Sequence, residues 1–190
     1  MILPIRAFGD PVLRKVGKEI NKDYPGLQDL IDSMFETMYS ANGIGLAAPQ
    51  VGLDIRMFIV DVTPLAEDED YEDIAEELKD FKKVFINAKI VEESGEEWKF
   101  NEGCLSIPDV REDVKRKSTI VIEYFDENFV KHKETFSDIR ARVIQHEYDH
   151  IEGTLFTDHL SSLKKKLVKG KLAKISQGDV SISYKMRFPK

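Results

Sequence analysis

Two histidines and a glutamate lie close together in the stretch QHEYDHIEG, residues 145–153. On an α-helix, positions four apart lie one above the other, so His146 and His150 can direct both imidazoles at one point. Glu147 is offset by one position around the axis, where a carboxylate can reach the water of a metal site without being a ligand. The spacing therefore predicts a divalent-metal site with its own general base. The alternative is a structural pair of histidines, and chance H-E-x-x-H matches rarely fall on a clean amphipathic helix.

A catalytic site of this kind needs a third protein ligand. After His150 the chain continues IEGTLFTDHL, which lacks the H-x-x-G-x-x-H extension, and Glu152 is too close to turn back around the helix. The remaining soft donor is Cys104, the single cysteine, in the block EGCLS. A lone cysteine is more often a small buried side chain, but a thiolate binds Zn, Fe(II) or Co(II) well. Beside an incomplete histidine pair, and next to Gly103, Cys104 is the predicted third ligand.

The helix that must position these histidines is predicted over SDIRARVIQHEYDHIEG. Ser137 is suited to the N-cap, Asp138 to the first turn and Gly153 to the C-terminal stop. Four apolar positions predict its buried face: Ile139, Val143, Ile144 and Ile151. The two histidines outside this helix, His132 and His159, are expected to be ordinary surface or core residues.

Hydrophobic periodicity predicts the remaining elements. An amphipathic helix that ends before Gly43 is predicted over LQDLIDSMFETMYSANG. Strands are predicted over IRMFIVDV, KKVFINAKIVEES and STIVIEYFDENFVKHKETF, the last with a turn at DEN. GIGLAAPQVG is expected to be too broken for a regular element, and EGCLSIPDVRE to be a loop or sheet edge. Residues 64–80 predict an acidic, solvated excursion, partly helical at its end. Strands before a long helix favour an α+β fold, with antiparallel or mixed sheets surrounding that helix.

Composition bounds the class of protein. With 190 residues, 42% hydrophobic and 33% charged, we expect one domain over residues 1–190 with a sound core. The chain has no apolar run of membrane-span length and no signal-peptide pattern, and a single cysteine suits a reducing compartment, so a cytoplasmic protein is expected. The net charge of −7 argues against general nucleic-acid affinity, and no specific DNA partner is expected.

Three sequence blocks occur in the order GIGLAAPQVG, EGCLSIP and QHEYDH. Together they resemble the three signature motifs of peptide deformylase, the family that removes the formyl group from the initiator methionine of nascent chains. The opening ILPIRAFGDPVLRKV and the later GTLFTDHLS are similar to the same family, so the resemblance covers roughly residues 2–165. It implies metal-assisted hydrolysis of an N-formyl amide, with formate as a product.

The resemblance also implies a role for each matching residue. Three residues would bind one divalent ion: Cys104, His146 and His150. Fe(II) is the usual ion of the family, and Zn, Ni or Co can occupy the same site. Glu147 would be the general base and then the general acid, while the Gln50 amide and the Leu105 backbone N–H would stabilise the oxyanion. The backbone of an extended N-formylmethionyl peptide would be held by Ile44, Gly45 and Gly103, and Arg111 matches a position that meets the peptide further along.

Two features depart from the commoner family pattern. Arg142 stands one turn before His146, where many members carry an apolar residue of the methionine pocket, and we expect its alkyl stem to pack there. At the C-terminal end, LSSLKKKLVKGKLAKI predicts a basic amphipathic helix and VSISYKMRFPK a final strand. This basic segment could dock on ribosomal RNA where the substrate emerges, or be a solvated lysine-rich face.

Two other functional hypotheses are compatible with parts of the sequence. A metallopeptidase acting on unformylated chains would keep the helix chemistry, but it leaves GIGLAAPQVG and Cys104 less well explained. A metal-stabilised binding protein without catalysis would have no need of Glu147 beside the water position.

Overall fold

The structure, a computed structural model, describes residues 1–189. Its helices are α1 (Leu27–Ser40), α2 (Ala75–Leu78), α3 (Asp138–Ile151) and α4 (Ser162–Ser176). Its strands are β1 (Ile5–Arg6), β2 (Gly45–Ala47), β3 (Met57–Asp61), β4 (Lys82–Cys104), β5 (Ile107–Phe125), β6 (Lys131–Ser137) and β7 (Met186–Arg187). Short 3-10 helices lie between them: Pro11–Arg14, Ala48–Val51, Thr63–Glu67, Glu69–Ile74 and Phe156–His159.

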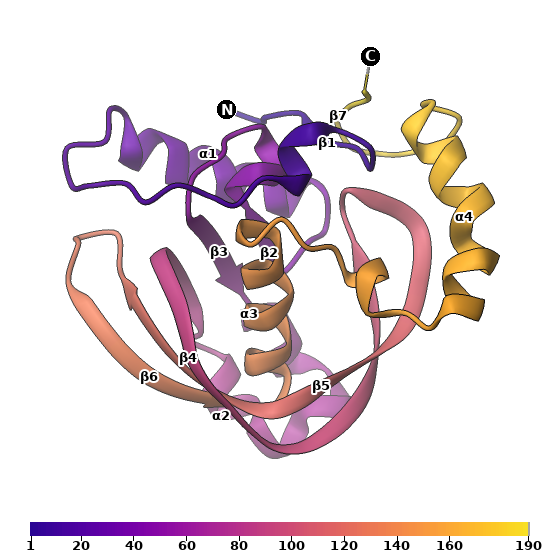
Figure 1. Cartoon of the computed structure of the whole chain (residues 1–190). Helices are drawn as coiled ribbons and strands as arrows, with labels where there is room; N and C mark the ends of the chain where they lie inside the picture. The colour runs from indigo at the N-terminus through magenta and orange to yellow at the C-terminus, as the bar shows by residue number, and fades with distance from the viewer. Residues whose placement is uncertain (190) are drawn as a thin grey trace.

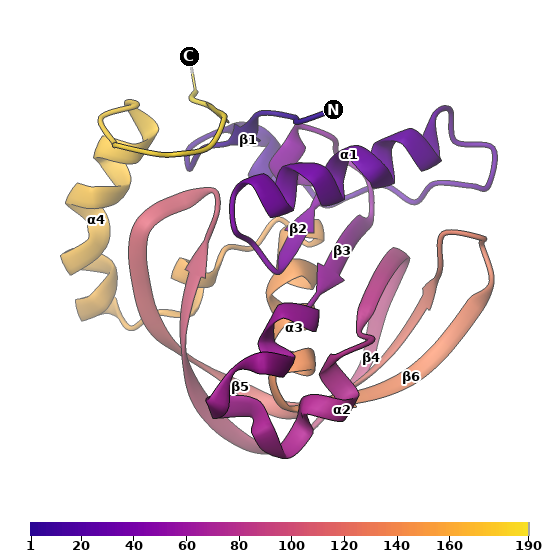
Figure 2. The ribbon, with the colours of Figure 1, turned by 180° about the vertical axis from the view of Figure 1, so that it is seen from behind.

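Strands β2 to β6 form one antiparallel sheet in chain order, and β1 pairs in parallel with β7. β4 and β5 make a long hairpin whose register shifts at several bulges, and bulges of this kind bend a strand pair. The bent hairpin sweeps around α3, and α4 stands outside it (Figures 1 and 2). The predicted α+β fold, with sheets surrounding a central helix, is confirmed.

Apolar side chains hold α3 against the sheet. Along β5, alternate residues Ile120, Ile122 and Tyr124 face the same side, as the two-residue period of a strand requires, and all are buried. The predicted apolar positions of α3 pack into the same core: Ile139, Val143, Ile144 and Ile151. Each fully buried side chain of this size contributes roughly 1.5–3 kcal/mol. This packing fixes α3 in place, so the histidines on its other side are rigidly positioned.

The ends of α3 correct one prediction. The side chain of Ser137 makes no capping hydrogen bond, and the Asp138 carboxylate instead accepts one from the Arg140 backbone N–H at 3.0 Å. The reason is that Ser137 is still the last residue of β6, where it pairs with Thr119, so capping moves one residue along. Gly153, with φ of 70°, ends the helix as predicted.

Three further segments differ from their predictions. GIGLAAPQVG is ordered, because Gly45–Ala47 pairs with β3 and Ala48–Val51 closes a 3-10 turn. EGCLSIPDVRE is paired strand on both sides of a tight turn at 105–106, and its one glycine and one proline lie within β4 and β5. Of VSISYKMRFPK, only Met186–Arg187 forms a strand, because its partner β1 is two residues long. Lys190, the last residue of that block, lies outside the described residues.

The other predicted elements are present. The first amphipathic helix is α1, the acidic excursion forms 3-10 turns and α2, and the basic segment forms α4. The segment STIVIEYFDENFVKHKETF divides at the predicted turn into the end of β5 and β6. Among the helices of residues 1–189, none is both long and apolar enough to cross a membrane.

Candidate active site

A cavity of about 500 Å³ lies beside α3, between β2 and the turn that joins β4 to β5. Its lining includes nine of the residues singled out in the sequence: Ile44, Gly45, Gln50, Gly103, Cys104, Leu105, Arg111, His146 and Glu147. The tenth, His150, is 1% exposed and contacts Cys104. The structure therefore brings all ten together from three separated sequence blocks.

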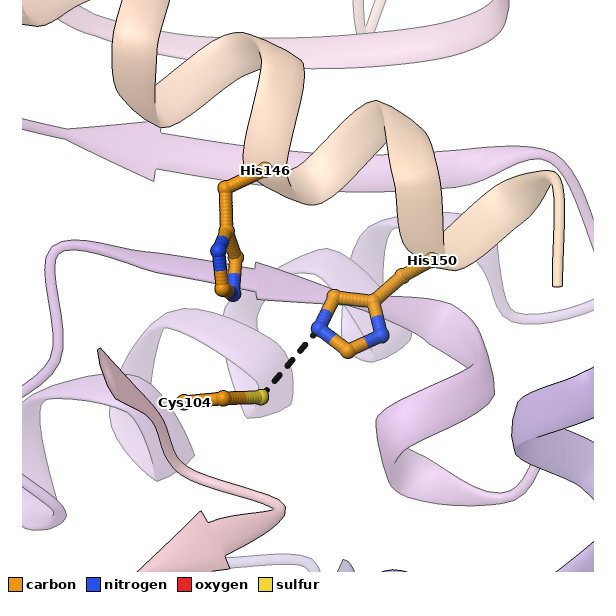
Figure 3. A group of neighbouring side chains, drawn as sticks. All are labelled: Cys104, His146 and His150. Atoms are coloured by element: carbon orange, nitrogen blue, oxygen red, sulfur yellow. Dashed lines mark hydrogen bonds between the residues drawn. The ribbon is translucent and has the colours of Figure 1, made fainter. Parts of the chain in front are cut away.

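Three possible metal ligands converge at this cavity. One ligand atom each from Cys104, His146 and His150 lies within 4.8 Å of the others, and the Cys104 Sγ is 3.3 Å from His150 Nε2. Both imidazoles project from α3 toward the end of β4 (Figure 3). Burial opposes ionisation of the Cys104 thiol, but the two neighbouring histidines outweigh it and lower its pKa to about 5. A thiolate and two imidazoles at this spacing suit a divalent ion such as zinc or iron.

Glu102, which the sequence analysis missed, orients His146. Its Oε2 lies 3.0 Å from His146 Nδ1, and the carboxylate also accepts hydrogen bonds from Arg116 Nε at 2.7 Å and Arg142 Nη1 at 3.0 Å. Burial alone would raise the pKa of Glu102, but the bonds from His146 and Arg116 hold it well below its usual value. A carboxylate on Nδ1 fixes the tautomer and leaves Nε2 for a metal ion.

The charged network continues away from the cavity. Arg116 Nη1 donates to Asp149 Oδ2 at 2.8 Å, and the same oxygen lies 2.8 Å from His159 Nε2. The sequence held two signs of this network. Glu102 directly precedes the glycine of EGCLS, and Arg116 shares the inward face of β5 with Val114 and Ile120. A charge on an apolar strand face needs a buried partner.

Glu147 is 4% exposed, and its Oε2 has no hydrogen-bond partner among residues 1–189. Burial is the main reason that its pKa rises to about 7. Strand β2 passes so close that a Cβ on Gly45 would lie 2.5 Å from Glu147 Oε1. A buried carboxylate with a pKa near neutrality is suited to exchange protons with a reactant.

The Gln50 amide has a fixed orientation. Its Oε1 accepts a hydrogen bond from the Ala47 backbone N–H at 2.8 Å, so Nε2 points the other way. That nitrogen donates to Ser106 Oγ at 3.2 Å and lies 3.5 Å from Cys104 Sγ. The cavity therefore has a neutral N–H donor beside the possible metal ligands.

Two arginines also line the cavity. Arg111 Nε donates to Asn101 Oδ1 at 2.9 Å, which directs its guanidinium along the edge of the hairpin. Arg142 is 2% exposed, donates to the Trp98 carbonyl at 2.7 Å and stacks 4.5 Å over the Trp98 ring. The charged end of Arg142 is thus held by the sheet while the residue forms part of the cavity wall.

Fold and site together define the class as a metal-dependent hydrolase whose active-site helix carries H-E-x-x-H. The family model described as polypeptide deformylase matches residues 2–166, so the chain belongs to the polypeptide deformylase family. Members of this family remove the formyl group from nascent peptides, and the deformylase hypothesis is confirmed over the peptidase and binding-protein alternatives.

The similarity to individual relatives extends over almost the whole chain. The chain is 64% identical over 190 residues to the peptide deformylase of Christiangramia forsetii, covering 100% of this chain and 97% of the relative. It is 62% identical over 189 residues to that of Flavobacterium johnsoniae, covering 99% and 96%. A peptide deformylase crystal structure from Legionella pneumophila superposes with a TM-score of 0.79 at 35% identity, covering 94% of this chain and 98% of that one.

Proposed function

We propose that deformylation takes place in the cavity beside α3, with Cys104, His146 and His150 binding one divalent ion. The observation that carries this proposal is the convergence of three ligand atoms next to a carboxylate oxygen of Glu147 that has no hydrogen-bond partner among residues 1–189. Residues 1–190 would act together as one catalytic domain.

Fe(II) is the ion we propose for the cell, with Zn, Ni or Co able to replace it. One thiolate and two imidazoles accept all of these ions, so ligand type alone does not select among them. When bound, the ion supplies Lewis-acid polarisation and makes a water molecule more nucleophilic near neutral pH.

Glu147 would accept the proton of the attacking water and later donate it to the departing amine nitrogen. A pKa near 7 allows the carboxylate to take up and release a proton at neutral pH. Oε2 has no partner among residues 1–189, so this oxygen is free to bond a reactant that enters the cavity.

Gln50 Nε2 and the Leu105 backbone N–H would donate to the oxygen that becomes negative as the formyl carbonyl is attacked. The Ala47 hydrogen bond prevents the Gln50 amide from turning its oxygen toward that charge. Removal of one such donor typically slows the reaction by about 10²- to 10³-fold.

The peptide would lie as an extra strand along the free edge of β2. This strand is at the end of the sheet, so its outer edge is available to a partner strand. Ile44 and Gly45 on one side, and Gly103 on the other, would hold the peptide backbone, with Arg111 further along. The methionine side chain would pack against Phe100, Val143 and the stem of Arg142, which line the same cavity.

We further propose that this cytoplasmic enzyme meets its substrate at the ribosome through α4. The helix carries six lysines: Lys164, Lys165, Lys166, Lys169, Lys171 and Lys174. Leu163 and Leu167 on the same helix are 68% and 69% exposed. Lysines arranged on an outer helix favour phosphate contacts, and such binding weakens steeply with salt.

Anaerobic purification with elemental analysis, paired with formate release from a formyl-Met tripeptide, tests the proposed centre. We expect about one metal ion per chain, loss of that ion in Cys104→Ser, and turnover lowered about 10²-fold or more in Gln50→Ala with metal retained. Full turnover in either variant would contradict the assigned roles.

Co-sedimentation with ribosomes over a salt series tests the docking proposal. Lys166→Gln/Lys169→Gln should sediment less than the parent, whereas Lys131→Gln/Lys133→Gln, with the same charge change on β6, should not. Equal sedimentation of the two double variants would refute docking through α4, and the formate assay would be unaffected by that result.

A further inference from the structure

Both ends of the chain contact the turn that follows Cys104. The Tyr184 hydroxyl donates to the Leu105 carbonyl at 2.7 Å, and the Phe8 backbone N–H donates to the Ser106 carbonyl at 2.8 Å. Two consecutive carbonyl groups of the turn are therefore held by residues that are far from it in sequence.

The two contacts are tied to each other by the small parallel sheet. Ile5 N–H donates to the Lys185 carbonyl and Ala7 N–H to the Arg187 carbonyl, each at 2.9 Å. Tyr184 directly precedes this pairing and Phe8 directly follows it, so the paired strands β1 and β7 hold the backbone next to both contacts (Figure 1).

Tyr184 also belongs to the cavity. It is half-buried and lines the same space as Gln50, Leu105 and Glu147. Burial, with smaller contributions from the charges of Cys104 and Asp109, raises the pKa of the Tyr184 phenol above its ordinary value. The hydroxyl therefore stays protonated and remains a hydrogen-bond donor at neutral pH.

We propose that Tyr184 is a positioning residue for deformylation: its hydroxyl fixes the turn that carries the Leu105 N–H, and its ring forms one wall of the substrate cavity. The proposal rests on the oxyanion role assigned to Leu105 above. A donor that is preorganised toward the developing charge lowers the barrier more than one that must reorient. Loss of the Tyr184–Leu105 hydrogen bond should therefore slow the chemical step.

Tyr184→Phe is the direct test, since it removes one oxygen and keeps the ring. We expect kcat to fall about three- to tenfold, the range of one ordinary hydrogen bond, while KM and metal per chain stay at parent values and Tm falls by no more than about 2–4 °C. Tyr24→Phe is the matched control, because it removes a tyrosine hydroxyl from the segment before α1. It should leave kcat, KM, metal per chain and Tm unchanged. Tyr184→Leu should lose the same factor in kcat and also raise KM, because the wall is removed.

A kcat of Tyr184→Phe within the error of the parent would overturn the positioning role of the hydroxyl, and so would a kcat loss matched by an equal loss of bound metal or by a Tm more than about 5 °C below the parent value. An unchanged KM in Tyr184→Leu would overturn the role of the ring. Gln50→Ala is measured in parallel. Full activity of Gln50→Ala refutes the proposed oxyanion site itself. A lowered kcat in Gln50→Ala together with a parent kcat in Tyr184→Phe refutes only the positioning role of the Tyr184 hydroxyl.

Discussion

Glu102 on β4 and Glu147 on α3 are both 4% exposed and both lie beside His146, one of the proposed metal ligands, yet their surroundings are opposite. Glu102 is bonded by four N–H groups from three residues, two from Arg116 and one each from Arg142 and His146. Glu147 keeps one oxygen without a partner among residues 1–189. The pKa of Glu102 is held well below its usual value, and that of Glu147 rises to about 7.

Burial alone therefore does not decide the charge of a carboxylate; its partners do. The surroundings of Glu102 are complete within the protein, so this residue is suited to hold a ligand in place. Glu147 has one oxygen without a partner among residues 1–189, which suits the proton-transfer role proposed for it. Changes at each residue should have correspondingly different consequences.

Glu147→Gln should give the largest effect on catalysis. The amide has the same shape but cannot accept the proton, so we expect formate release to fall by about 10²- to 10⁴-fold. Bound metal, measured by elemental analysis, should remain at the parent level because Glu147 is not among the proposed ligands. A variant with more than a tenth of parent turnover would show that the carboxylate is not the base.

Glu102→Gln should mainly affect stability and metal binding. Arg116 and Arg142 would lose a buried counter-charge, which typically costs about 3–5 kcal/mol, and metal affinity should fall about 10- to 100-fold as His146 loses its orienting partner. Urea unfolding and metal titration measure the two effects. Glu96→Gln, exposed on the same strand, should change the free energy of unfolding by no more than about 0.5 kcal/mol.

The two carboxylates should also give opposite pH dependences. The folded-state pKa of Glu147 is raised from 4.5 to about 7, so its contribution to the stability of the metal-free protein becomes unfavourable as pH rises through that window. Metal-free Glu147→Gln should therefore be more stable than the parent by roughly 2–4 kcal/mol at pH 8 and equal to it at pH 4.

The folded-state pKa of Glu102 is depressed, so its stabilisation is present above pH 4.5 and is lost only as pH falls well below that value. Urea unfolding of the metal-free proteins across pH 4–8 measures the slope that Glu147 causes, whereas the contribution of Glu102 should stay nearly constant over this range. A stability difference between parent and Glu147→Gln that does not vary with pH would contradict the raised pKa.

Gly45→Ala should give the smallest of these effects. Its Cβ would lie 2.5 Å from Glu147 Oε1, so the carboxylate must shift, and we expect turnover to fall roughly tenfold with about 1–3 kcal/mol of destabilisation. Gly170→Ala in α4 meets no atom within 4 Å and should raise stability by about 0.5–1 kcal/mol without changing turnover. Equal behaviour of the two variants would show that β2 and Glu147 are not in close contact.

The sequence was most informative where chemistry follows from local spacing. His146, Glu147 and His150 are within one helix, so their mutual geometry is set by the helical repeat. Cys104 could be added because the chain has one cysteine and the pair lacked a ligand. The α+β architecture followed from strands that precede a long helix.

The remainder depends on contacts between distant segments. Arg116 and Glu102 pair across the β4–β5 hairpin, and its bulges shift the register by amounts that a single sequence does not specify. Tyr184 reaches Leu105 across 79 positions. Ser137 was a reasonable cap by type, but its strand pairing with Thr119 took precedence over the local preference.

The pairing of β1 with β7 also has a consequence for biosynthesis. Met186 and Arg187 are translated long after Ile5 and Arg6, the residues with which they pair. The first strand must therefore wait, without this partner, until residues 186–187 have left the ribosome. The turn that follows Cys104 can gain its contacts with Phe8 and Tyr184 only after that point in synthesis.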